Sequence, residues 1–179
     1  EEIVDGLECR IVTCGKRTDS NYRAEDITYD HFARAAFRLM IDGQDAGEIT
    51  LGVPGEHNVY NALAAIALCR DLGIDMEHIR AGLKKFTGTN RRFEKKGEIG
   101  GVTIIDDYAH HPQEIAATLA AAKNYPHKKL WCVFQPHTYT RTKAFFHEFA
   151  DALSLADKIV LADIYAARET DPGDIHSKD

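Results

Sequence analysis

The second half of the chain alternates short apolar runs with helix-like segments, and this alternation limits the possible folds more than any other feature. Apolar runs at residues 102–105, 130–134 and 159–162 have the length and composition of buried strands. Residues 112–124 and 142–155 lie between them and have helical character, and a further strand is expected near residues 93–99. This order and spacing predict an α/β fold with a parallel, Rossmann-like sheet.

The first half has a β-rich pattern that changes to a helical one. Strands are expected at residues 9–14, 22–29, 35–41 and 48–51, with Asp42-Gly43 as a hairpin signal. From about Val59 the apolar spacing becomes helical and stops at Gly73, and Asp75 is expected to cap a second helix that runs to about Leu83. We interpret residues 88–90 as a hinge between two domains, residues 1–88 and residues 89–179.

Polar side chains follow the strand at residues 102–105. They are Asp106, Asp107, Tyr108, His110 and His111, and they precede Pro112, which suits the first turn of a helix. The carboxyl end of a strand in an α/β sheet is where such folds bind ligands. A single Asp at this place could instead cap a helix, and a single His could belong to the core. We interpret Asp106 as a capping or loop-pinning residue.

His137 and Arg141 follow the next apolar strand. We expect the two strand ends to bring Tyr108, His110, His137 and Arg141 to one rim of the sheet. A cation and imidazoles can hold a carboxylate and help to manage a proton.

Two other pairs of polar residues are candidates for nucleotide binding. Asn58 could cap the helix that begins near Val59. Asn61 lies one turn further on, however, and two amides can give both donors and acceptors to an adenine edge. Arg91 and Arg92 follow the hinge; an exposed arginine pair is usually solvated, but the glycine-rich approach favours one guanidinium that is held inward to grip phosphate oxygens.

Four motifs together resemble the Mur ligase family. In chain order they are Gly55-Glu56-His57-Asn58-Val59-Tyr60-Asn61-Ala62, Gly88-Thr89-Asn90-Arg91-Arg92-Phe93, Ile105-Asp106-Asp107-Tyr108-Ala109-His110-His111-Pro112 and Gln135-Pro136-His137-Thr138-Tyr139-Thr140-Arg141-Thr142. Their order makes the similarity specific, and the flanking sequence is similar too. The resemblance implies the second half of a P-loop-type central ATPase domain, followed by an incomplete Rossmann-like C-terminal domain.

The resemblance also implies roles for individual residues. Asn58 and Asn61 would face adenine, Arg92 the γ-phosphate, Asp107 the ribose hydroxyls, and Tyr108, His110, His137 and Arg141 the incoming amino acid. Thr138 departs from the family's commonest form, which has arginine there, so half of a two-arginine clamp is missing. Residues 163–169 are expected to be rim structure, with Arg168 as their functional group.

The implied activity is that of an ATP-dependent, amide-forming ligase of peptidoglycan precursor synthesis. The motifs are closest to members that add L-alanine to UDP-N-acetylmuramate through an acyl phosphate; a related alternative joins a peptide to the same sugar nucleotide. The glycine-rich phosphate loop of the family does not occur in this sequence. We expect that loop upstream, and the catalytic lysine, the ligands of the Mg²⁺ cofactor and the N-terminal sugar-nucleotide domain outside this chain. We therefore expect no catalytic residue within this chain and no activity from it alone.

A metal-dependent hydrolase is an alternative from another class. It would use Asp106, Asp107, His110, His111 and His137 as metal ligands. Because adjacent residues point in divergent directions, we expect no metal site.

Composition limits the partners and the compartment. A net charge of −6 without a basic stripe argues against nucleic acid, and the apolar runs fall short of the ~20 residues that span a membrane. The four cysteines form no C-x-x-C pair, which is typical of reduced thiols in the cytoplasm. The expected partners are therefore small molecules: ATP, UDP-N-acetylmuramate and L-alanine.

Overall fold

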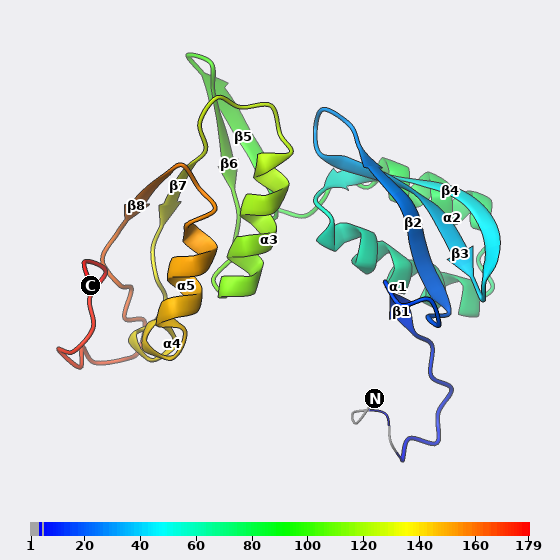
Figure 1. The fold of residues 1–179 in the computed structure, drawn as a ribbon, viewed down its shortest axis with the longest axis horizontal. Helices are drawn as coiled ribbons and strands as arrows, with labels where there is room; N and C mark the ends of the chain where they lie inside the picture. The colour runs from blue at the N-terminus through cyan, green and yellow to red at the C-terminus, as the bar shows by residue number, and fades with distance from the viewer. Residues whose placement is uncertain (1–3, 5) are drawn as a thin grey trace. The chain divides into compact units, whose positions relative to one another are not determined.

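A computed structural model describes residue 4 and residues 6–179. The described chain forms two compact units. The first contains the described residues up to Asp30 and Arg34–Thr87, and the second contains His31–Ala33 and Gly88–Asp179. The prediction of an α/β fold is confirmed, and Figure 1 shows the two units, each with its own strands and helices.

The first unit contains a four-stranded sheet in the order β1-β2-β3-β4. Its strands are β1 (Cys14–Gly15), β2 (Tyr22–Tyr29), β3 (Arg34–Ile41) and β4 (Gln44–Pro54). Asp42 and Gly43 join β3 to β4, and both have positive φ angles, 48° and 79°, as a tight hairpin turn requires. The predicted hairpin is confirmed.

Two strands of the first unit differ from the prediction. The prediction of a strand at residues 9–14 is wrong, because only Cys14 of that range is in a strand. The Thr13 backbone N–H donates instead to the Asn21 side chain at 3.0 Å, so a side chain takes the place of a ladder partner. β4 is longer than expected because it pairs with β3 directly from the turn.

Helices α1 (His57–Asp71) and α2 (Met76–Lys85) pack on this sheet. The innermost side chains of the core include Phe37, Leu39, Ile49, Leu63 and Ile66. α1 ends as predicted: Gly73 has φ 79°, its N–H donates to Arg70 O, and the Ile74 N–H donates to Cys69 O. Asp75 caps α2 by accepting the His78 N–H at 3.0 Å, which confirms that prediction.

The second unit begins with an antiparallel hairpin of β5 (Glu94–Ile99) and β6 (Val102–Asp106). Next come α3 (Pro112–Lys123), β7 (Trp131–Phe134), α4 (Tyr139–Ala144), α5 (Phe146–Leu153) and β8 (Lys158–Leu161). β7 and β8 pair in parallel, as predicted. β6 pairs with β5 instead, and within the described ranges no ladder joins β6 to β7.

The helix expected at residues 142–155 is two helices. The chain leaves helical geometry at Phe145, whose φ and ψ are −120° and 30°. The Phe145 ring packs edge-on against His111 at a centroid distance of 4.8 Å. We attribute the break to this contact, because it holds the Phe145 side chain against the start of α3.

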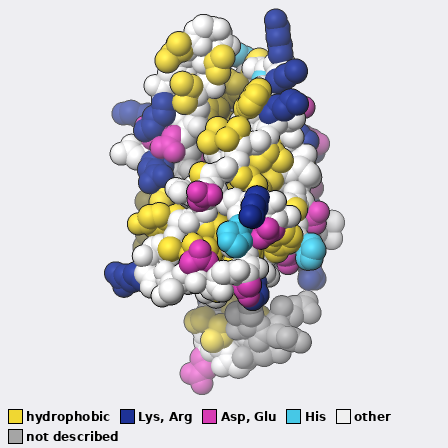
Figure 2. Space-filling view, turned by 90° about the vertical axis from the view of Figure 1, so that its left-hand side faces the viewer, with side chains coloured by type: hydrophobic (Ala, Val, Ile, Leu, Met, Phe, Trp, Pro, Cys, Tyr) yellow, Lys and Arg dark blue, Asp and Glu magenta, His cyan; other side chains and the backbone are white. Residues whose placement is uncertain are grey.

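The core of the second unit lies between α3, α5 and β7. Its buried members are Ile115, Leu119, Phe134, Phe149, Ala152 and Leu153. Apolar side chains of β7 and β8 nevertheless remain exposed, among them Val133 at 76% and Trp131 at 61%. Hydrophobic side chains are spread over much of the surface in Figure 2, which looks onto the molecule from the β8 side. In the part of the chain that the structure describes, no helix combines the length and apolar character needed to cross a membrane.

Candidate functional site

The two carboxylates at the end of β6 have different surroundings. Asp107 accepts two backbone N–H groups, from Phe93 at 2.8 Å on Oδ2 and from Ala109 at 2.7 Å on Oδ1. Asp106 Oδ2 lies 3.4 Å from Arg91 Nε and 3.9 Å from Lys96 Nζ. Asp107 therefore ties the loop to the start of β5, and a loop-pinning role of Asp106, through Arg91 and Lys96, stays a prediction.

The residue that caps the start of α3 also differs from the prediction. His111, not Asp106, is the N-cap, and its Nδ1 accepts the Gln113 N–H at 3.4 Å. Glu114 completes a capping box by accepting the N–H groups of His110 and His111 at 3.0 and 3.2 Å. Pro112 occupies the first turn as predicted. Partial burial acts to raise the pKa of Glu114, but the two backbone N–H bonds and the nearby His110 and Arg92 together outweigh it and hold that pKa below its usual range.

Tyr108, His110 and Arg92 gather around this helix start. His110 Nδ1 lies 3.0 Å from Tyr108 O and 3.6 Å from Glu114 Oε2. Arg92 Nη1 lies 3.8 Å from Glu114 Oε1. The exposed Tyr108 ring contacts His110 edge-on, and the Arg91 guanidinium covers it at 4.8 Å. One side of the site therefore carries two guanidinium groups, a phenol and an imidazole.

His137 and Arg141 follow β7 and contact each other. Arg141 Nη1 donates to the His137 carbonyl at 2.9 Å. The His137 ring stacks on Tyr165 at a centroid distance of 5.4 Å, and the two backbones form an isolated parallel bridge. Among the described residues, the bond to the His137 carbonyl is the hydrogen bond of the Arg141 side chain, so its other guanidinium N–H groups are available to an anion.

Glu169 is a contact residue that the sequence did not indicate. Its Oε1 accepts the Thr138 hydroxyl at 2.6 Å and its Oε2 accepts the Thr140 N–H at 2.9 Å. These hydrogen bonds, the Thr138 bond first, hold the pKa of Glu169 below its usual range. The sequence pointed to the neighbouring Arg168, and no local pattern connects Glu169 with threonines about thirty residues earlier.

The two strand ends are linked through the helices that follow them. The His111–Phe145 ring contact joins the start of α3 to the junction of α4 and α5. Within residues 6–179, no hydrogen bond, ion pair or ring contact joins Tyr108 or His110 to His137 or Arg141. The structure thus shows each half of the expected site as a contacting pair, and the meeting of the two halves stays a prediction.

The ligand set of the hydrolase alternative does not converge. Asp107 accepts two backbone N–H groups, His111 caps α3 and His137 stacks on Tyr165. Over the described residues, no group of three or more His, Cys, Asp or Glu side chains is placed to hold a metal ion.

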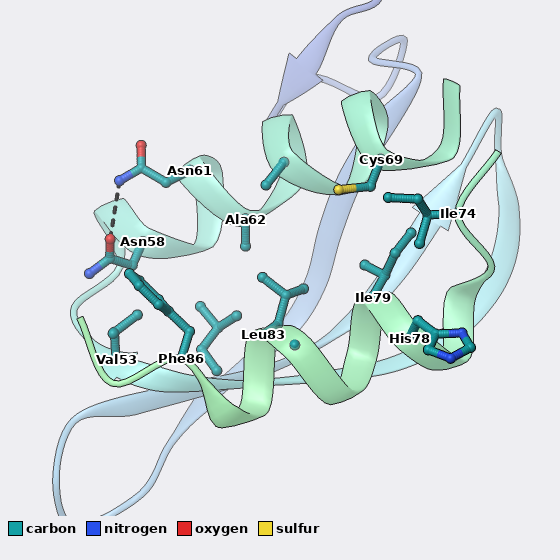
Figure 3. Close-up of a pocket in the computed structure, with 13 residues that line it drawn as sticks. Val53, Asn58, Asn61, Ala62, Cys69, Ile74, His78, Ile79, Leu83 and Phe86 are labelled. Atoms are coloured by element: carbon teal, nitrogen blue, oxygen red, sulfur yellow. Dashed lines mark hydrogen bonds between the residues drawn. The ribbon is translucent and has the colours of Figure 1, made fainter. Parts of the chain in front are cut away.

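Asn58 and Asn61 lie in the first unit, at one end of a cavity of about 460 Å³ between α1 and α2 (Figure 3). The expected N-cap role of Asn58 is wrong, because α1 begins earlier and its N-cap is Glu56. Asn58 Nδ2 donates to Pro54 O at 2.7 Å, and Asn61 Nδ2 donates to Asn58 Oδ1 at 3.1 Å. The Asn61 carbonyl oxygen and one N–H of each amide remain for a ligand.

Comparisons with known proteins cover both units. The model of the Mur ligase middle domain matches residues 2–69, and that of the "Mur ligase, glutamate ligase domain" matches residues 91–178. A UDP-N-acetylmuramate–L-alanine ligase of Lachnospira eligens is 63% identical over 180 residues, covering 100% of this chain and 39% of the relative. A ligase of the same name from Lachnoclostridium phytofermentans is 53% identical, with 100% of this chain and 40% of the relative covered.

Solved structures of ligases also align with most of this chain and with about a third of their own length. The UDP-N-acetylmuramate-alanine ligase of Thermotoga maritima aligns with a TM-score of 0.72 and 36% identity, over 83% of this chain and 33% of that one. A murein peptide ligase of Psychrobacter arcticus aligns with a TM-score of 0.55 and 31% identity, over 79% of this chain and 30% of that one. The chain spans about two fifths of the length of the curated relatives it matches.

Proposed function

The chain belongs to the Mur ligase family, and from that membership we propose that it is part of an ATP-dependent ligase joining L-alanine to UDP-N-acetylmuramate. The observation that carries the proposal is the 63% identity, along the whole chain, to a relative with that name. We propose that residues 1–88 are the second half of the central ATP-binding domain and residues 89–179 most of the C-terminal amino-acid-binding domain.

The proposed reaction forms one amide bond and cleaves one ATP. The muramoyl carboxylate attacks the γ-phosphorus of ATP, giving an acyl phosphate and ADP. The amine of L-alanine then attacks the acyl carbon, the tetrahedral intermediate expels phosphate, and the amine loses a proton. Catalysis of such steps consists chiefly of positioning and charge neutralisation. We place the catalytic lysine, the phosphate loop and the magnesium ligands outside this chain.

Each unit supplies candidate groups for contacts with the nucleotide. The Asn61 carbonyl oxygen and the remaining N–H of each amide, Asn58 and Asn61, complement the donor and acceptor groups of an adenine edge. Arg92 has a half-exposed guanidinium whose ion-pair partner lies as far as 3.8 Å, so it is available to a phosphate. Each oxygen of Asp107 accepts one N–H and has further acceptor capacity, which suits ribose hydroxyls.

The acceptor amino acid would lie between the two strand ends. Arg141 supplies a cation for its carboxylate, and His110 and His137 supply imidazoles for the proton that its amine loses. Tyr108 would form the wall of this site, because its exposed ring lies beside His110.

The related alternative is a ligase that joins a peptide to the same sugar nucleotide. The murein peptide ligase structure is 31% identical to this chain, whereas the alanine ligase of Lachnospira eligens is 63% identical, and this difference favours alanine. We propose the cytoplasm as the compartment, because the cysteines Cys9, Cys14, Cys69 and Cys132 are all free thiols.

Phosphate release by the full-length protein tests the proposal. With ATP and UDP-N-acetylmuramate present, release is expected to depend on L-alanine and not on a tripeptide of the cell-wall type. A preference for the peptide would establish the alternative, and release that needs no sugar nucleotide would overturn both. The 179-residue chain alone is expected to release no phosphate above the blank, because it lacks the phosphate loop.

A further inference from the structure

The segment after β8 supplies a carboxylate to the first turn of α4. The first N–H groups of a helix have no partner within the helix, and the residue before it normally provides one with its own side chain. Thr138 is the N-cap of α4, yet its side chain makes no capping bond. Glu169 takes this place: it accepts the Thr140 N–H and, with its other oxygen, the Thr138 hydroxyl.

The capped turn lies between the two candidate acceptor residues after β7. His137 precedes Thr138 directly, and Arg141 follows Thr140 directly. Arg141 also donates to the His137 carbonyl, so both groups depend on the backbone path of this one turn. We propose that Glu169 is a positioning residue for the acceptor amino acid, because it fixes the turn that carries His137 and Arg141. The inference rests on the proposed function.

The rest of the segment is held in place without the Glu169 carboxylate. Ile164 and Ile175 are buried, the Tyr165 N–H donates to Pro136 O at 2.9 Å, and Gln135 Nε2 donates to Asp163 O at 3.1 Å. Lys143 pairs with Asp174 at the other end of the segment. Removal of the carboxylate is therefore expected to loosen the turn and to leave the unit folded.

The chemistry of the carboxylate suggests a graded set of variants. Glu169→Ala removes both acceptors. Glu169→Gln keeps one carbonyl oxygen for the Thr140 N–H, and its amide can donate to the Thr138 oxygen, since a hydroxyl both donates and accepts. Thr138→Val removes one bond of the pair. Glu148→Gln, at an exposed glutamate of α5, is the control for the loss of one negative charge.

The test measures Michaelis constants for L-alanine and ATP in the full-length ligase. Glu169→Ala is expected to raise the alanine constant about tenfold and the ATP constant less than twofold. Glu169→Gln is expected to have an alanine constant close to that of the unmodified protein, and Glu148→Gln to match it. The alanine constant of Thr138→Val is expected to lie between those of Glu169→Gln and Glu169→Ala. Equal changes in both constants, or no change in Glu169→Ala, would overturn the proposal.

Hydrogen exchange gives a readout that does not depend on the acceptor being alanine. The Thr140 amide is expected to exchange at least tenfold faster in Glu169→Ala than in Glu148→Gln, with unchanged exchange in α3. An unchanged Thr140 amide would overturn the positioning role even in an active enzyme. A fast Thr140 amide in an enzyme that does not use L-alanine would overturn the proposed function and leave the capping role standing.

Discussion

Asp107 Oδ2 accepts the backbone N–H of Phe93 at 2.8 Å, across fourteen residues of sequence. Phe93 directly precedes β5 and has a left-handed backbone with φ 48°, whereas Asp107 directly follows β6. The bond therefore closes the base of the β5–β6 hairpin. Since its other oxygen holds the Ala109 N–H, the same carboxylate also sets the loop that carries Tyr108 and His110.

Asp107→Asn is expected to weaken both the hairpin and ATP use. The amide has one acceptor oxygen where the carboxylate had two, so one backbone N–H faces an N–H₂ group. The loss of one such bond should lower the free energy of unfolding by about 1–3 kcal/mol. The Michaelis constant for ATP should rise more than that for L-alanine.

The control for Asp107 is its neighbour. Asp106→Asn removes a carboxylate that lies 3.4 and 3.9 Å from exposed cations, and such pairs contribute roughly 0–1 kcal/mol. Urea unfolding and steady-state kinetics of both variants check the difference. Equal destabilisation by the two variants would contradict the pinning role of Asp107.

Gly52→Ala is expected to destabilise the first unit. A Cβ at Gly52 would lie 2.2 Å from Phe86 O and 2.6 Å from Lys84 O, and both are backbone atoms that cannot move without shifting the end of α2. Overpacking of this kind costs typically about 1–3 kcal/mol. Gly82→Ala, within α2, meets no atom within 4 Å and should instead stabilise by about 0.5–1 kcal/mol. Thermal unfolding of the two variants should show shifts of opposite sign.

Glu114 is expected to make stability depend on pH in the acid range. Its pKa is depressed in the folded protein, so the unfolded chain binds the proton more readily. Its contribution is therefore fully present above the ordinary glutamate pKa and is lost as the pH falls through the depressed folded value. Glu114→Gln should remove that part of the acid slope when the free energy of unfolding is measured between neutral pH and pH 3. An unchanged slope would show that the capping box does not shift this titration.

Local signals were predicted well from the sequence. The Asp42-Gly43 turn, the Gly73 stop and the Asp75 cap each depend on a few adjacent residues, so their physical causes are visible in the sequence. The β5–β6 pairing is also local, because Gly100-Gly101 brings adjacent strands together, and this pairing replaced the expected parallel partner of β6.

Contacts between distant segments could not be predicted in the same way. Asp106 and Asp107 are adjacent acids, and only the position of the Phe93 N–H distinguishes them. Glu169 meets Thr138 across 31 residues, and the strand between them gives no sign of the contact. The residue types at the candidate site were therefore predictable, whereas the partner that holds each one was not.

Arg141→Ala is expected to raise the L-alanine requirement of the full-length ligase by about ten- to a hundredfold. The reason is the loss of a charged hydrogen bond to the amino-acid carboxylate, worth roughly 1.5–3 kcal/mol. The structure adds a second reason, because Arg141 Nη1 also holds the His137 carbonyl.

Lys143→Ala is the matched control: it removes an equal charge from α4, but its ammonium pairs with Asp174. Kinetics at saturating ATP should separate the two variants, and an equal rise in the alanine constant for both would show that only the net charge of α4 matters. If Arg141→Ala raised the ATP constant instead, the cation would belong to the nucleotide and the acceptor site would have to lie elsewhere.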